Sequence, residues 1–218
     1  MADKKQKRPV HKVRGIAGFP WLNRPDTKFK AEGIYKTNLT VPGDDAQATI
    51  EVIEAAMKEA EAEAKEKAKA KRKTAKPADM PFDPEVDDEG NETGAVVFKF
   101  KSTASGVSKK TGKPWTRTIP IFDAKGKPSK ANIYGGSELV IAFTAEPWVN
   151  AKLEYGVKLQ LEAVQIINLV TGGGSRSASA YGFGEEDGYS ADDEEELGQA
   201  DDGDEDETSE AEDGDDDF

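Results

Sequence analysis

The amino-acid sequence predicts a mainly β fold, a small five-stranded barrel with one long inserted helix, followed by a disordered acidic tail. Five segments show the alternating or continuously apolar pattern of short strands, and one segment shows an apolar stripe at helical spacing. Residues 185–218 hold 20 of the 43 acidic residues and none of the 30 basic ones. Residues 1–184 therefore keep 23 acidic against 30 basic residues, a net charge of +7, so a basic body precedes a tail that cannot form a core.

The chain begins with a basic arm and a first strand. Residues 1–28 are rich in lysine, arginine, proline and glycine, and we expect them to be mostly irregular, with Phe19, Trp21 and Leu22 as an anchor onto the body. Residues 29–41 alternate apolar and polar side chains up to Pro42, which predicts a half-buried strand.

A long helix follows this strand. Asp44 with Gln47 three residues later predicts a capping box for a helix that runs to about residue 73. Acidic residues dominate its first turns and basic residues its last, which suits the helix dipole. The charged run fits a solvated helix face; the alternative is a second nucleic-acid or partner surface at the basic end. The apolar stripe consists of Ile50, Ile53, Met57, Ala60 and Ala64.

The remaining strands are predicted after a long, proline-rich connection at residues 74–94. Because five strands are too few for a sandwich of two full sheets, a partly open barrel is the economical closure. Pro120 indicates an edge or a bulge in its strand. With the first strand, the predicted strands are residues 95–104, 115–123, 137–146 and 156–170.

Four regions follow from these patterns. We expect a basic N-terminal arm (1–28), a barrel domain (29–171), a flexible linker (172–184) and an acidic C-terminal tail (185–218). The tail ends in the isolated aromatic residue Phe218.

The composition argues against an enzyme. The chain has no cysteine, and its single histidine, His11, lies in the charged arm, so thiol chemistry, a Ser-His-Asp triad and multi-histidine metal sites are not expected. The run from Gly106 to Pro114 has the wrong spacing for a phosphate-binding P-loop. We therefore predict no catalytic residues, no metal site, no cofactor and, for want of a long apolar run, no membrane partner.

Basic residues interleaved with aromatic ones are the main functional signal. Single-stranded nucleic acid requires this mixture, because cations follow the phosphates while flat rings stack on unpaired bases. For the aromatic residues the alternative is ordinary core packing, above all for Phe98 and Phe100. The candidate DNA-binding residues are Lys99, Lys101, Lys109, Lys110, Lys113, Trp115, Arg117, Trp148, Lys152, Tyr155 and Lys158.

Several motifs resemble one protein family. The segments GIYKTNLTVPG, DMPF, VVFKFKSTA, IYGGSELVIAF and GVKLQLEAVQIINL, and an acidic tail closing on DDDF, occur in this order. In these motifs the chain is similar to the single-stranded DNA-binding proteins of short-tailed lytic bacteriophages of the T-odd type (podoviruses).

The resemblance implies an OB-fold barrel that binds single-stranded DNA as a homodimer in phage DNA replication, recombination and repair, in the cytoplasm of the infected bacterial host. It further implies strand protection and annealing, and recruitment of the phage DNA polymerase and helicase-primase through the tail. Trp148 takes the family's stacking position, with Tyr155 second, while Lys109 and Lys152 follow the phosphates. The partner-binding residues would be Asp215, Asp216, Asp217 and Phe218.

We expect DNA and the acidic tail to compete for one cationic groove. The main alternative is an acidic-tailed chaperone or scaffold protein that binds basic partners, and another is an RNA-binding module of the cold-shock kind.

Overall fold

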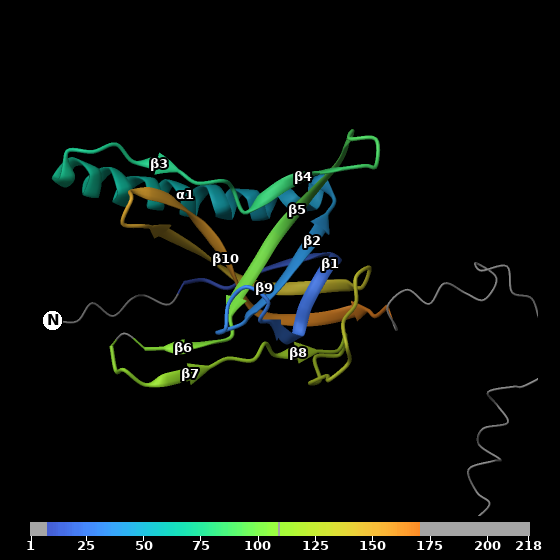
Figure 1. Cartoon of the computed structure of the whole chain (residues 1–218). Coiled ribbons are helices and arrows are strands. Elements are labelled where there is room, and N and C mark those ends of the chain that lie inside the picture. Colours follow the sequence, from blue (N-terminus) through green and yellow to red (C-terminus); the bar gives the residue numbers. More distant parts are fainter. Residues whose placement is uncertain (1–7, 109, 171–218) are drawn as a thin grey trace, which may run out of the picture. The chain divides into compact units, whose positions relative to one another are not determined.

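The computed structural model describes residues 8–108 and 110–170. The predicted linker and acidic tail, including Asp215, Asp216, Asp217 and Phe218, lie outside the described residues, as does Lys109. In the described part, no helix is long and apolar enough to cross a membrane. The elements are β1 (His11–Asp26), β2 (Ile34–Val41), α1 (Gly43–Lys71), β3 (Lys76–Pro77), β4 (Phe82–Val86), β5 (Glu92–Thr103), β6 (Ser105–Val107), β7 (Pro114–Thr116), β8 (Ile121–Phe122), β9 (Glu138–Val149) and β10 (Glu154–Asn168) (Figure 1).

Five long strands close into a barrel in the order β1-β2-β5-β10-β9. Neighbouring strands are antiparallel except at the closure, where β5 and β10 run parallel. This closing seam is short, with Leu159 opposite Phe100 and Gln160 opposite Lys101. The predicted mainly β barrel with one long helix is confirmed.

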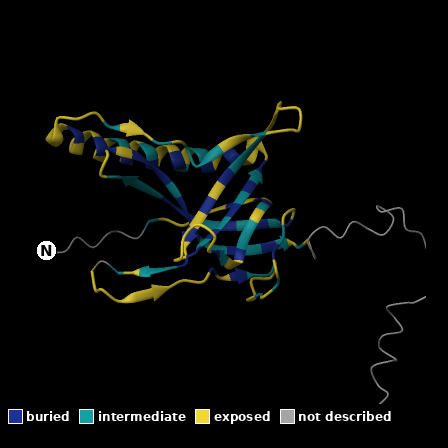
Figure 2. Cartoon of the chain, in the orientation of Figure 1, coloured by how far each residue is buried: buried dark blue, intermediate teal, exposed yellow. Residues whose placement is uncertain are grey.

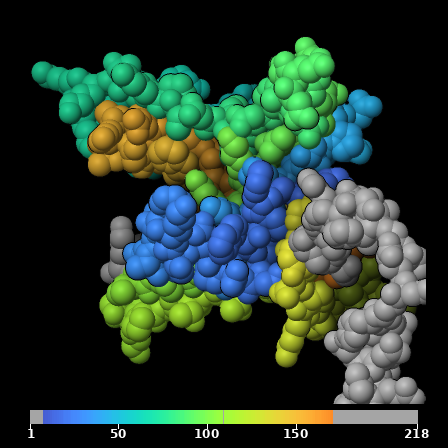
Figure 3. All heavy atoms as spheres, turned by 45° about the vertical axis from the view of Figure 1, so that its right-hand side comes forward, coloured from blue at the N-terminus to red at the C-terminus, as the bar shows by residue number. Residues whose placement is uncertain are grey.

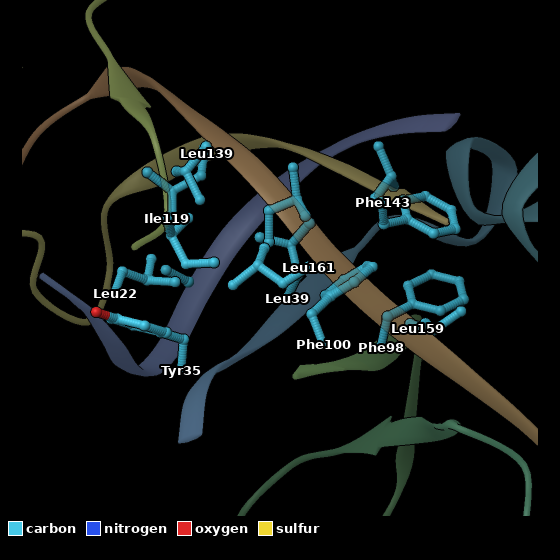
Figure 4. Close-up of a cluster of buried hydrophobic side chains, with 14 of the residues drawn as sticks. Leu22, Tyr35, Leu39, Phe98, Phe100, Ile119, Leu139, Phe143, Leu159 and Leu161 are labelled. Carbon is cyan, nitrogen blue, oxygen red and sulfur yellow. The ribbon is translucent and has the colours of Figure 1, made fainter. Parts of the chain in front are cut away.

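The barrel interior is filled by apolar side chains from all five strands (Figure 4). Phe100 and Phe143 meet edge to face, with 5.2 Å between ring centroids. Phe98 and Phe100 are fully buried, so they are core residues and not base-stacking ones. In β2 the predicted alternation is confirmed, because Tyr35 and every second residue after it are buried.

The helix α1 packs a stripe of small side chains against β9 and β10. Ala56, Ala60, Ala64 and Ala68 are all buried, and their small volume lets the helix lie close to the strands. The helix matches its predicted bounds, but the capping box is wrong: Pro42 is the N-cap residue, and no side chain caps the helix.

The prediction that residues 1–28 are irregular is wrong for residues 11–26, which form β1 between β2 and β9. Gly15 marks a close approach of two strands instead of a loop. A Cβ atom on Gly15 would lie 2.4 Å from the carbonyl oxygen of Thr40. The register shifts between Gly18 and Trp21, and Phe19 has a φ of 49°, which together define a β-bulge. Of the predicted anchor residues, Leu22 is buried but Phe19 is exposed.

The prediction of one strand at residues 115–123 is also wrong. β7 pairs with β6 in a separate hairpin, while β8 pairs with β10. Pro120 separates them; it has no N–H to donate, and its carbonyl accepts from the N–H of Val164 at 3.0 Å. The connection at residues 74–94 contains the short strands β3 and β4. The number of barrel strands was thus right, but β1 stands where residues 115–123 were expected.

Two hairpins extend from the barrel on the same side (Figure 1). The far ends of β9 and β10 run beside α1, and β6 with β7 forms the second projection. Residues of the β6–β7 hairpin are mostly exposed or half-buried (Figure 2). Each of these two hairpins carries a tryptophan, Trp148 in β9 and Trp115 in β7.

Candidate nucleic-acid interface

Three lysines lie in neighbouring positions on the outer surface of the barrel. Lys36 of β2 is opposite Lys101 of β5, and Lys101 is opposite Gln160 of β10, two residues after Lys158. Residues directly opposite each other in neighbouring strands project to the same side of a sheet. We call Lys36, Lys101 and Lys158 the lysine row; it crosses the seam that closes the barrel.

Lys101 lies close enough to two other lysines, Lys158 of the row and Lys30, for their charges to affect it. Burial lowers the pKa of Lys101, and the nearby ammonium groups of Lys158 and Lys30 lower it further. Among the described residues, no carboxylate forms a salt bridge with Lys101, whereas Lys158 pairs with Glu146 at 3.1 Å. Lys101 is therefore an exposed cation beside like charges, and an external anion would stabilise its charged form.

Lys36 has a carboxylate partner in the same surface. Its Nζ donates to Asp26 at 2.6 Å. This hydrogen bond, followed by one from the backbone N–H of Lys28, lowers the pKa of Asp26. Lys36 is consequently a partly neutralised member of the row.

The connection between β1 and β2 adds an aromatic ring beside this charge. Phe29 is 81% exposed, and the Nζ of Lys28 lies 5.4 Å from its ring centroid. Lys30 follows and is near Lys101. These residues were not among the predicted DNA-binding ones, because Lys28 was expected in an irregular arm and Phe29 and Lys30 in a half-buried strand, although Lys28-Phe29-Lys30 has the same basic-aromatic alternation as the predicted sites. Figure 3 shows a hollow between the blue surface of the early residues and the orange tip of the β9–β10 hairpin.

The β9–β10 hairpin carries Trp148, Lys152 and Lys158. Trp148 lies in β9 opposite Gly156, because β9 extends beyond residue 146, where the predicted strand ended. Its ring covers Gly156, because a Cβ atom there would be 2.9 Å from Cζ2 of the ring. Lys152 is exposed in the turn, where its backbone N–H donates to Oδ1 of Asn150 at 2.9 Å. Trp148 is thus held flat while part of its surface stays open.

Tyr155 does not share this surface. It is 8% exposed and packs against Ala60 and Ala64 of α1. It neighbours Gly156 in β10, and successive residues of a strand point to opposite faces. The prediction that Tyr155 is a second stacking residue is therefore corrected: its ring supports the hairpin against the helix.

The β6–β7 hairpin presents a second tryptophan. Trp115 is opposite Gly106, whose Cβ atom would lie 3.0 Å from Cζ2 of the ring. Trp115 is 39% exposed, and Lys110 and Lys113 in the adjoining turn are exposed. Both tryptophans at the hairpins therefore use the same device, a ring laid over a cross-strand glycine.

Arg117 and Lys99 have structural partners. Nη1 of Arg117 donates to the Ser102 hydroxyl at 3.0 Å, and Nε2 of Gln160 donates to the same oxygen at 2.7 Å. Arg117 thus fastens the base of the β6–β7 hairpin to the closing seam. Lys99 pairs with Asp83 of β4, which reduces its value as a phosphate contact.

The described residues offer no metal-binding cluster: across 8–108 and 110–170 no three histidine or carboxylate residues are grouped to hold an ion. The arrangement that is present consists of a cationic barrel surface, an exposed phenylalanine and tryptophans fixed on two hairpins. Five-stranded Greek-key barrels of this kind bind single strands on the surface of strands two and three, between adjoining loops. The fold and the surface define an OB-type protein that binds single-stranded nucleic acid.

Comparison with known sequences identifies the family. The family model described as "Single-stranded DNA-binding protein, Bacteriophage T7" matches residues 14–169. The single-stranded DNA-binding protein of Escherichia phage T7 is 35% identical over 167 residues, which cover 73% of this chain and 72% of that protein. That of Enterobacteria phage T3 is 31% identical over 187 residues, 79% of this chain and 81% of the relative. The chain belongs to this family of phage single-stranded DNA-binding proteins, which are not enzymes.

Solved structures agree. The crystal structure of gp2.5, a single-stranded DNA-binding protein encoded by bacteriophage T7, matches with a TM-score of 0.66 and 32% identity, covering 85% of this chain and 100% of that one. The single-stranded DNA-binding protein of bacteriophage Enc34 in complex with single-stranded DNA matches with a TM-score of 0.51 and 15% identity, covering 77% of this chain and 97% of that one. The second likeness shows a shared fold.

Proposed function

We propose that the chain binds single-stranded DNA without sequence preference, along the lysine row and between Trp148 and the β1–β2 connection, in phage DNA replication, recombination and repair. The observation that carries the proposal is Lys101, an exposed cation of the barrel surface that has Lys158 and Lys30 beside it and, among the described residues, no carboxylate in a salt bridge with it. Membership of the family supports the choice of DNA as the ligand.

The proposed mechanism separates the work of charge and of stacking. Phosphates replace solvent counterions around the lysines, so affinity falls as salt rises. Bases stack on Trp148 and Phe29, and on Trp115 of the second hairpin. Stacking is tolerant of sequence because every base has a flat face.

The acidic residues 185–218 supply the regulatory part of the proposal. Their charge and a connecting segment of about 14 residues would give an effective concentration on the order of millimolar at the basic surface. DNA and this segment would compete for the same cations. Displacement would free Asp215, Asp216, Asp217 and Phe218 to recruit the phage DNA polymerase and helicase-primase.

We further propose that the protein acts as a homodimer that protects and anneals DNA strands in the cytoplasm of the infected bacterial host. Two binding surfaces in one particle would hold complementary strands near each other, which raises their local concentration. These statements rest on family membership.

Titration of tryptophan fluorescence tests the function. We expect oligo-dT to quench the emission, with an affinity that falls steeply with salt, and duplex of equal length to bind much more weakly. Quenching by RNA in preference to DNA would favour a cold-shock-like role. If no nucleic acid quenches and basic proteins bind tightly, the chaperone alternative replaces the proposal.

A further inference from the structure

A pocket of about 610 Å³ opens beside the bulge of β1. One wall is formed by residues 19–24 and the other by residues 132–134, which precede β9. Three of the lining residues are aromatic, Phe19, Trp21 and Tyr134, and Arg24 contributes a positive charge. Among the described residues that line the pocket, none is acidic.

Phe19 at the rim is in an unusual state. Its ring is 82% exposed, and its φ of 49° lies in the left-handed region that residues with a Cβ atom disfavour. Because the ring stays exposed, no burial of apolar surface offsets the energetic cost of this backbone conformation. A strained residue that holds an apolar ring in solvent indicates a binding role.

The pocket walls are held in place by side-chain interactions. Nδ2 of Asn23 donates to the carbonyl of Ala131 at 2.7 Å, and its Oδ1 accepts from the N–H of Ile133 at 2.9 Å. The guanidinium carbon of Arg24 lies 5.7 Å from the Trp21 ring centroid. A cation is therefore fixed beside a flat ring, as a nucleotide requires.

The pocket continues the lysine row. Trp21 is opposite Lys36, which is opposite Lys101. Neighbouring strands are about 4.8 Å apart, so the Trp21 backbone lies roughly 10 Å from that of Lys101. A DNA strand that follows the row away from Trp148 would reach this pocket next.

We propose that this pocket is a second base-binding site, which takes an unpaired nucleobase of the DNA already bound on the lysine row. The base would stack on Phe19 and Trp21 at the pocket, with its phosphate near Arg24. The volume is within the usual range of small-ligand sites. The inference rests on the proposed function and extends the DNA path across β1.

The test compares oligo-dT of increasing length on the full chain. Phe19→Ala should weaken binding of long oligonucleotides about five-fold or more, the effect of losing one stacked base. It should leave unchanged the short ones that span only Trp148 and the lysine row. Ile16→Ala is the matched control, because Ile16 is an exposed apolar residue of the same strand outside the pocket.

Photocrosslinking of the unmodified protein to iodouracil-substituted oligonucleotides provides a second measurement. Crosslinks at Phe19 or Trp21 support the site. Crosslinks confined to other residues, equal affinity of Phe19→Ala at every length, or an equal loss in Ile16→Ala would overturn it. A gain in affinity would mean that the chain's own acidic segment occupies the pocket, which also overturns it. If the unmodified protein binds no oligonucleotide of any length, the proposed function itself fails.

Discussion

Trp148 combines two roles, since its ring packs over Gly156 and also faces solvent in part. We predict that Trp148→Ala weakens single-stranded DNA binding by ~1–3 kcal/mol, because one stacking surface is lost. Trp148→Phe should recover much of this affinity, since it keeps a ring. Isothermal titration with oligo-dT measures both, and circular dichroism checks the fold. Equal losses in the two variants would contradict a stacking role.

Lys101 should make DNA binding depend on pH. Its pKa is lowered in the free protein, so raising the pH neutralises Lys101 before it would neutralise a lysine with the ordinary pKa. Affinity should therefore fall as the pH rises from neutral toward the ordinary lysine pKa, and binding should take up protons, since a nearby phosphate raises the pKa again. Affinity measured over this pH range checks the prediction.

Lys101→Arg is the matched control for that experiment, because a guanidinium keeps its charge at these pH values. This variant should bind DNA with a flatter pH profile. In contrast, Lys101→Gln should lower the slope of log affinity against log salt by about one unit or less. An unchanged slope in Lys101→Gln would remove Lys101 from the DNA path.

At the scale of single residues, the sequence could identify residue types that suit DNA binding but not what each side chain packs against. The clustering of Trp148, Lys152 and Lys158 was predicted from their proximity in the chain, and all three lie on the β9–β10 hairpin. Tyr155 belonged to the same cluster, yet it faces α1. The packing of α1 against the sheet decides which face of β10 meets the helix. The spacing of residues within β10 does not reveal this packing.

The β9–β10 and β6–β7 hairpins each hold a tryptophan ring over a glycine, and substitution of that glycine tests whether the position of the ring matters for DNA binding. A Cβ atom at Gly156 or Gly106 would lie 2.9 or 3.0 Å from the covering tryptophan ring, so the ring must shift. We predict that Gly156→Ala weakens DNA binding by less than Trp148→Ala does, and that Gly106→Ala acts in the same way through Trp115. Fluorescence quenching by oligo-dT measures each effect.

Double-mutant cycles provide the control for these glycine variants. If Gly156→Ala acts by moving the ring, it should have little further effect once Trp148 is alanine. The same holds for Gly106→Ala in a Trp115→Ala background. Additive losses would instead mean that the substitutions damage the hairpins themselves.

The elements show what patterning can predict. β2, α1, β5, β9 and β10 were located because their apolar periodicity extends over eight residues or more. β1 was missed because Gly15, Gly18 and Pro20 suggest a loop, whereas Gly15 is required by the close approach of β2. Residues 115–123 were misassigned because a continuous β-rich run does not reveal that Pro120 divides it between two pairings.

At the scale of the whole molecule, charge is divided between a body of +7 and an acidic segment with 20 carboxylates. We predict that deleting residues 193–218 tightens binding to oligo-dT several-fold at low salt and abolishes association with the phage polymerase. The gain should shrink as salt rises, because exposed charges are screened within about 10 Å at 0.1 M salt. Affinity measured with and without these residues checks this. Equal affinities at 50 mM salt would contradict competition.

The barrel is closed by only two pairs of opposed residues between β5 and β10. Lys101 and Lys158 stand on opposite sides of this join, so one bound phosphate backbone would tie both edges together. Bound DNA would then stabilise the shortest strand pairing of the barrel. Amide hydrogens around Phe100 and Leu159 should therefore exchange with deuterium more slowly when DNA is present. Binding of single-stranded DNA and closure of the barrel between β5 and β10 would then stabilise each other.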